Sequence, residues 1–124
     1  MKRRKPLKRS WFKARGPSWR SEPEYREAVL RAFLPYTRGD SVRCIFCGRY
    51  YSEEDITPCH IRAVGSNYEL RAEVKNIVPA CFTCHGKYEL KTNERKARMI
   101  EDKIPSRWAE LEALKRRCYA EVSK

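Results

Sequence analysis

Four of the six cysteines in this chain form two Cys-x-x-Cys pairs, Cys44 with Cys47 and Cys81 with Cys84. Zn²⁺ takes four thiolate ligands in a tetrahedron, and turns with this spacing present both sulfurs on one side. The two pairs therefore predict one structural Zn²⁺ site, which leaves no coordination position open for water. The alternative is four separate core cysteines, which seldom show such paired spacing in a reduced protein.

Both histidines of the chain lie beside these cysteines, with an asparagine between them. His60 lies between the two pairs, Asn76 follows it, and His85 comes directly after Cys84. Together with the first cysteine pair and His60-Ile61, the run NIVPACFTCH from Asn76 to His85 resembles the signature of the HNH endonuclease family. The resemblance covers residues 42–92 and not the termini.

The resemblance implies an α+β fold with a small ββα-metal core, also called the HNH or His-Me finger. In that core two antiparallel strands are followed by a helix, here braced by the four-cysteine zinc site and flanked by N- and C-terminal helices. It implies that His60 is the general base, that Asn76 orients its ring, and that His85 binds a catalytic divalent metal. The expected activity is hydrolysis of DNA phosphodiester bonds.

The physical demands of that reaction agree with these residue types. A phosphodiester repels nucleophiles by its own charge, so hydrolysis needs a divalent cation, Mg²⁺ or Mn²⁺, that neutralises the developing negative charge. It also needs a base that activates water, and a histidine titrates near neutrality. An amide oxygen that holds the other ring nitrogen would fix the tautomer of the base.

The other ligands of the catalytic metal stay open. The family often has Asp before the catalytic histidine, whereas this chain has Cys59. A thiolate suits Mg²⁺ poorly and Zn²⁺ or Mn²⁺ better, so Cys59 is either a ligand or a packed residue. Glu89 shares a helix face with His85 four residues earlier, and is either a second ligand or a solvated partner of a lysine. Asp55 is a weaker candidate, because its acidic run suits a hydrated turn.

The charge of the chain predicts a polyanionic partner. The 124 residues carry a formal net charge of +12, with a pI near 9.7. Each Lys or Arg placed on a phosphate releases condensed counterions, so DNA is the first candidate and an anionic membrane surface the second. Residues 1–20 hold no acidic side chain and are interpreted as a flexible basic arm. The expected DNA contacts are Lys2, Arg3, Arg4 and Lys5 in the arm, and Arg62, Lys75, Lys87 and Lys91 around the site.

The chain shows neither an apolar run of membrane-span length nor a secretion signal at its N-terminus. We therefore expect an intracellular, cytoplasmic protein in a reducing compartment, and a phage origin is compatible with it. The length allows one domain, residues 21–124, with 42–92 as its motif core. A double-strand cut by an enzyme with one site would favour a homodimer or two successive nicks.

Sequence periodicity predicts the elements that position these residues. Apolar spacing after the start signal at Ser21 predicts a helix over 22–34. Short extended pieces are expected at 42–45, 50–51, 57–62 and 77–80. Helices should follow Cys84, resume after Asn93, and begin again after Pro105, the last with Trp108, Leu111, Leu114, Cys118 and Val122 on one face.

Two other classes of protein compete with the nuclease hypothesis. A non-catalytic zinc-ribbon DNA-binding or phage regulatory protein explains the cysteines and the charge, but leaves His60, Asn76 and His85 without a role. An RNA-binding or ribosome-associated zinc protein fits the charge equally, yet it predicts stacking aromatics on an exposed sheet, which the segment between Cys44 and Cys84 does not suggest.

Overall fold

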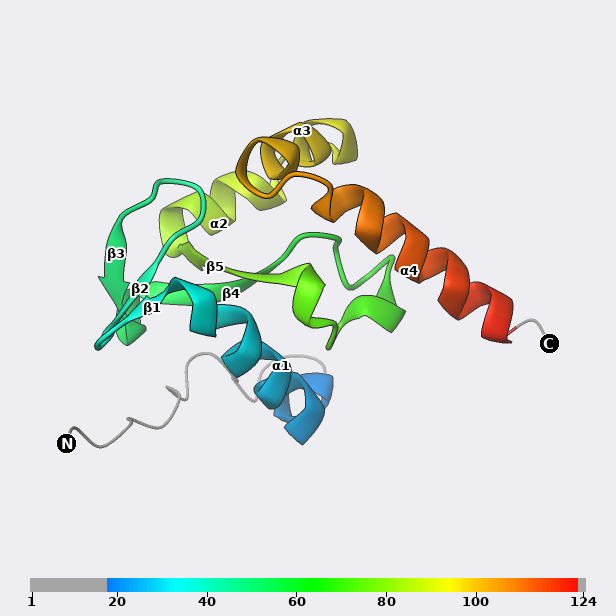
Figure 1. The fold of residues 1–124 in the computed structure, drawn as a ribbon, viewed down its shortest axis with the longest axis horizontal. Helices are drawn as coiled ribbons and strands as arrows, with labels where there is room; N and C mark the ends of the chain where they lie inside the picture. Colours follow the sequence, from blue (N-terminus) through cyan, green and yellow to red (C-terminus); the bar gives the residue numbers. More distant parts are fainter. Residues whose placement is uncertain (1–17, 123–124) are drawn as a thin grey trace.

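The computed structural model describes residues 18–122, and the side chains of residues 19–117. These residues form a small α+β fold with two antiparallel sheets and four α-helices (Figure 1). The α-helices are α1 (Pro23–Phe33), α2 (Phe82–Glu89), α3 (Asn93–Lys103) and α4 (Arg107–Val122). The strands are β1 (Thr37–Arg38), β2 (Ser41–Arg43), β3 (Tyr50–Ser52), β4 (Ile56–His60) and β5 (Ile77–Cys81). Short 3-10 turns are η2 (Ser18–Ser21), η3 (Leu34–Tyr36), η4 (Glu53–Asp55), η5 (Tyr68–Leu70) and η6 (Val74–Asn76).

The first helix, α1, matches the predicted helix to within one residue at each end. Pro23 fits its first turn because that turn leaves backbone N–H groups without helical acceptors. Its buried face consists of residues at helical spacing and packs on β5. These residues are Tyr25, Ala28, Val29, Ala32 and Phe33.

Strands β4 and β5 form the central hairpin, with Ile56 opposite Cys81 and His60 opposite Ile77. Every residue of β5 is buried, because α1 packs on this strand and α2 packs on both strands of the hairpin. The two helices lie on opposite sides of the hairpin in Figure 1. Helix α2 begins at the residue after β5, so strand, strand and helix follow one another along the chain.

The second sheet joins β1, β2 and β3 in that order. The predicted extended pieces correspond to β2, β3, β4 and β5, but β1 is an element that the sequence did not predict. It pairs with β2 across a tight turn at Gly39, whose φ of 61° is accessible to glycine at little cost. The Ile45 backbone N–H donates to the Pro79 carbonyl (3.1 Å) and so ties the segment after β2 to β5.

Helix α4 closes the fold over the long connection between β4 and β5, packing on η5, η6 and α3. Leu111 on its predicted apolar face is fully buried, and Trp108 and Leu114 are partly buried. The side chains of Cys118 and Val122 lie outside the described residues. None of the helices within residues 18–122 combines the length and apolar character that a bilayer span requires.

The described chain has one hydrophobic core. The folded part of the chain begins earlier than residue 21, where the sequence predicted that the domain would start after the basic arm. Ser18–Ser21 forms a 3-10 turn and Trp19 is only 5% exposed. Trp19 therefore packs against the folded domain, with its ring edge on Tyr25 at 4.9 Å between centroids. Lys2, Arg3, Arg4 and Lys5 lie outside the described residues.

Candidate functional site

The four predicted cysteines converge into one cluster. The Sγ atoms of Cys44, Cys47, Cys81 and Cys84 all lie within 4.8 Å of one another. Four thiolates around Zn²⁺ at about 2.3 Å would place their sulfurs about 3.8 Å apart, so only small adjustments separate this arrangement from a closed site. The prediction of a four-cysteine site is confirmed to this extent: the cluster can hold a metal ion such as zinc.

Local backbone structure explains why the cysteines meet. The Gly48 N–H donates to the Cys44 carbonyl (2.9 Å), and Gly48 adopts a φ of 75°, which lets the chain turn directly after Cys47. The second pair spans the end of β5 and the first turn of α2, because Cys81 is the last strand residue and Cys84 lies one helical turn later.

The surroundings of Cys47 favour its thiolate, the form that binds metal. Burial alone would raise its pKa, but hydrogen bonds from the Tyr51 hydroxyl and the Arg49 backbone N–H outweigh that effect and lower it to about 7. The Tyr51 hydroxyl lies 3.3 Å from Cys47 Sγ. Tyr51 was not singled out by the sequence, and only its position four residues after Cys47 could have suggested this contact.

A second site lies on another face of α2, where a pocket of about 240 Å³ opens between η2, α1, β4, α2 and α3. His60, His85 and Glu89, three residues singled out by the sequence, all line it. The remaining lining residues are Trp19, Arg20, Tyr25, Thr57, Pro58, Ala63, Val64 and Lys96.

His60, at the end of β4, is held from three sides. Its Nε2 donates to the Arg71 carbonyl (2.9 Å), its ring stacks on Tyr25 at 5.8 Å between centroids, and Trp19 meets it edge-on at 5.5 Å. Burial lowers its pKa to about 4, partly opposed by the Arg71 carbonyl. The ring is therefore neutral at physiological pH, and the bond at Nε2 leaves Nδ1 as its proton acceptor.

His85 and Glu89 occupy one face of α2, as their spacing predicted. His85 Nε2 lies 2.8 Å from Glu89 Oε1. The sequence left Glu89 as either a second metal ligand or the partner of a lysine. Its ion-pair partner is His85 and not a lysine. Such a pair offers one nitrogen and one carboxylate to a shared ligand.

Cys59 differs from its proposed role as a metal ligand. It is fully buried and is not among the residues that line the pocket. Burial raises the pKa of its thiol far above its usual range, so Cys59 stays protonated and behaves as a packed core residue. Within the described chain, the four-cysteine cluster is the one place where three or more potential ligand atoms of His, Cys, Asp or Glu lie within 4.8 Å of one another.

Asn76 is fully buried, and in contrast to the expected role its amide forms hydrogen bonds with backbone groups and not with the His60 ring. Its Oδ1 accepts from the Arg62 N–H (2.7 Å), while its Nδ2 donates to the carbonyls of Arg62 (3.1 Å) and Leu70 (3.2 Å). Asn76 therefore fixes the backbone of the β4–β5 connection, and the Arg71 carbonyl that accepts from His60 belongs to the residue directly after Leu70.

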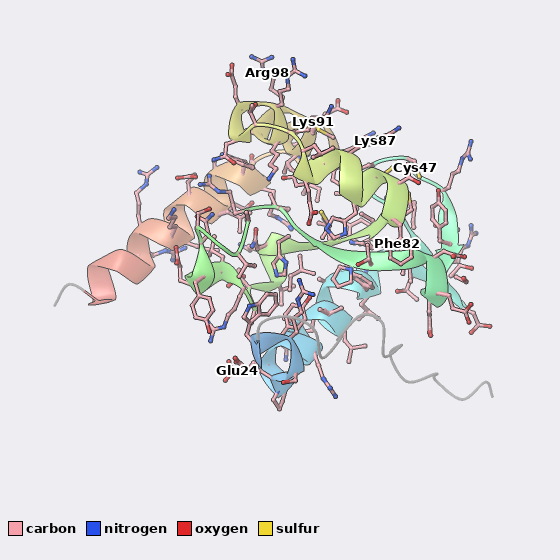
Figure 2. The ribbon with its side chains drawn as sticks, turned by 180° about the vertical axis from the view of Figure 1, so that it is seen from behind. Glu24, Cys47, Phe82, Lys87, Lys91 and Arg98 are labelled. Atoms are coloured by element: carbon pink, nitrogen blue, oxygen red, sulfur yellow. The ribbon has the colours of Figure 1, made fainter. Side chains whose placement is uncertain are left out.

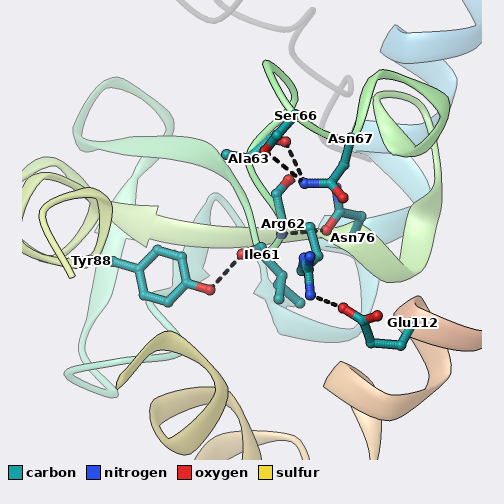
Figure 3. Close-up of polar contacts among 8 residues, drawn as sticks. All are labelled: Ile61, Arg62, Ala63, Ser66, Asn67, Asn76, Tyr88 and Glu112. Atoms are coloured by element: carbon teal, nitrogen blue, oxygen red, sulfur yellow. Dashed lines mark hydrogen bonds and ion pairs between the residues drawn. The ribbon is translucent and has the colours of Figure 1, made fainter. Parts of the chain in front are cut away.

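Further hydrogen bonds stiffen the same connection (Figure 3). The Tyr88 hydroxyl donates to the Ile61 carbonyl (2.6 Å), and Asn67 Nδ2 donates to the Ala63 carbonyl (2.9 Å) and to Ser66 Oγ (3.1 Å). Side chains thus satisfy backbone groups where the chain has no regular structure, and so keep the loop behind His60 in place.

The basic residues expected around the site are distributed differently. Arg62 is ion-paired with Glu112 and lies over the Trp108 ring, 4.5 Å from its centroid, while Lys75 pairs with Glu110 at 2.9 Å. Helix α4 supplies all three partners, so Arg62 is held in a largely buried ion pair and Lys75 in an exposed one. Lys87 and Lys91 lie on or just after α2, and neither lines the His60 pocket.

The cations that do line the pocket are Arg20 and Lys96, which sequence reasoning missed. Arg20 precedes α1 and carried no motif. Lys96 had a usable signal, because it lies four residues before the buried Ile100 and therefore on the inward face of α3.

Comparison of the chain with protein-family models, curated proteins and solved structures found no match.

Proposed function

We propose that this protein is a metal-dependent DNA endonuclease that hydrolyses phosphodiester bonds at the His60 pocket. The observation that carries the proposal is the convergence of His60, His85 and Glu89 on one pocket at a hairpin followed directly by a helix. Neutral His60 offers Nδ1 to accept a proton from water. The tautomer that leaves this nitrogen free is stabilised by the Arg71 carbonyl.

His85 and Glu89 are the residues that would hold a catalytic divalent ion, Mg²⁺ or Mn²⁺. Their contact at 2.8 Å brings a nitrogen and a carboxylate oxygen together from one helix face. When bound, such an ion would polarise the scissile phosphate and neutralise the charge that develops on it. The four-cysteine cluster, in the proposed zinc-bound form, would fix the start of α2 and so the direction in which His85 and Glu89 project.

DNA as the partner is supported by the net charge of +12 and by the placement of exposed cations. Figure 2 shows Lys87 and Lys91 projecting outward along the edge formed by α2 and the segment after it, on the opposite side of the molecule from Glu24 of α1. Cations on this edge would contact phosphates without reading base sequence. The unpaired thiols of the cluster suit a reducing compartment, so we place the activity inside the cell.

A non-catalytic zinc-containing DNA-binding protein is the second candidate. It is favoured by the observation that the described residues bring three or more ligand atoms together only at the cysteine cluster. In that case the pocket would bind nucleic acid without cleaving it, and His60 would serve packing alone.

Incubation of supercoiled plasmid with Mg²⁺, with Mn²⁺ or with no divalent ion separates the two candidates. We expect nicking only with a divalent ion. Replacement His60→Ala should lower the rate by about 10²–10⁴-fold, the usual contribution of a general base. His85→Ala should raise the metal concentration needed for half-maximal rate, whereas Cys59→Ala should leave it unchanged. DNA that is bound but uncut in every metal condition would rule out the nuclease.

A further inference from the structure

Lys96 is a charged side chain in an unusual setting. It extends from α3 into the wall of the His60 pocket and is only 8% exposed. Its ammonium lies over the Tyr88 ring, 5.3 Å from the centroid. Within the described part of the chain, no carboxylate lies within 4 Å of it.

Glu89, the one acidic side chain among the described residues that line the pocket, forms no ion pair with Lys96 within 4 Å. Glu89 is engaged with His85 at 2.8 Å on the other helix. Contact with the Tyr88 ring offsets only part of the cost of removing an ammonium from water, and a buried cation is normally paired with an anion. The folded protein therefore holds an ammonium group that is nearly buried, and a bound anion would neutralise it.

The rest of the pocket narrows the choice of anion. Arg20 lines the same cavity and adds a second, planar donor, which matches phosphate oxygens in geometry. The volume of about 240 Å³ admits a phosphate group with part of the sugar to which it is attached, and not a nucleotide duplex. Thr57 also lines it with a hydroxyl that can donate to an oxygen.

From these observations we propose that Lys96 is the phosphate-binding residue of this pocket, with Arg20 as its partner. Both would contact non-bridging oxygens of one phosphate held beside His60. Only the assignment of that phosphate to a DNA backbone rests on the proposed nuclease function. The binding of a phosphate by Lys96 stands on burial, missing counter-charge and pocket geometry alone.

Thermal unfolding of the full chain, with its cysteine cluster loaded with zinc, tests the proposal. The probes are inorganic phosphate and a thymidine dinucleotide that contains one phosphodiester. Lys96→Met keeps much of the length of the side chain but removes the charge. Arg98→Met on the same helix is the matched control, because that guanidinium is exposed and pairs with Glu94 at 2.7 Å.

We expect phosphate to raise the melting temperature of the wild type and of Arg98→Met, and to bind Lys96→Met at least tenfold more weakly. Without phosphate, Lys96→Met should melt at the same temperature as the wild type or higher, because it buries no unpaired charge. That baseline excludes misfolding as the cause of lost binding.

Equal affinity of Lys96→Met and wild type for both probes would overturn the proposal, as would failure of both probes to protect the wild type. Tighter binding of the dinucleotide than of inorganic phosphate would assign the site to a nucleic-acid backbone, and the reverse order to a free or terminal phosphate. If binding depends on Lys96 and plasmid stays uncut, the anion site is retained and the nuclease is rejected.

Discussion

The cysteine cluster and the His60 pocket share helix α2 but are built in different ways. Helix α2 supplies Cys84 to the cluster and, from another face, His85 and Glu89 to the pocket. The cluster takes its four ligands from two short local turns. The pocket takes its lining from η2, α1, β4, α2 and α3 and from the long β4–β5 connection.

The cluster is determined by local sequence spacing, whereas the pocket is determined by packing between distant elements. A Cys-x-x-Cys pair is preorganised by a single turn, so each half of the cluster is determined locally. The pocket depends on packing between elements far apart in sequence, so its chemistry can change with each of them. We therefore expect changes at the cluster to affect the whole fold, and changes at the pocket to affect one region.

The largest expected effect is loss of a cluster ligand. In zinc-finger peptides a structural zinc contributes about 10–16 kcal/mol, which exceeds the net stability of most small domains. Cys44→Ser should therefore lose bound metal and a cooperative thermal transition, measured by elemental analysis and circular dichroism. The control is Cys59→Ala, which removes a buried thiol outside the cluster and should retain metal at a cost of about 1 kcal/mol. Equal metal loss in both variants would contradict the assignment of the cluster.

The next largest effect should follow from Asn76→Asp. The carboxylate keeps the acceptor for the Arg62 N–H but removes both donations, so the Arg62 and Leu70 carbonyls lose their donor next to a buried charge. We expect a loss of about 3 kcal/mol in the free energy of unfolding, measured in urea, with cluster metal retained. The control is Asn93→Asp at the exposed first turn of α3, where the charge is neutral or favourable. A loss of metal with Asn76→Asp would show that the two regions are not separable.

The pH dependence of stability tests the burial of His60. Because burial lowers its folded pKa from 6.5 to about 4, the unfolded chain binds more protons than the folded one between those values. The contribution of His60 is complete above pH 6.5 and is lost as pH falls towards 4, a change of about 3 kcal/mol. Urea unfolding of wild type and His60→Asn across this range should show that difference, and the comparison subtracts any acid effect on the cluster. Parallel curves would mean that His60 is exposed.

The features that the sequence predicted are those that local spacing determines. The cysteine pairs, helix α1 and the strands that frame the site were predicted, because each depends on periodicity or spacing within a few residues. The two-residue strand β1 was missed, since so short a piece has no pattern apart from its partner.

Roles that depend on tertiary contacts were not predictable in the same way. The sequence placed Asn76 beside His60, but could not show that its amide would satisfy loop backbone groups. Arg62 and Lys75 were expected near DNA, and only the return of α4 over the loop reveals Glu112 and Glu110 as their partners. The spacing of Lys96 to Ile100 could have predicted that Lys96 lies on the inward face of α3. It could not have predicted that Lys96 has no carboxylate partner, because that depends on the other elements that form the pocket.

The smallest expected effect concerns which lysines contact DNA, and it compares two residues of the same type. Lys87 lies on α2 beside the cysteine cluster and, in the described structure, has no ion pair, whereas Lys75 is paired with Glu110 at 2.9 Å. Lys87→Ala should reduce the slope of log affinity against log salt by about 0.9, the release expected for one phosphate contact. Lys75→Ala should leave the slope unchanged, because its charge is already neutralised within the protein. Binding of a fluorescent DNA duplex over a range of salt concentrations measures both slopes. A reduced slope for Lys75→Ala alone would place the DNA on the α4 side of the molecule instead of along α2.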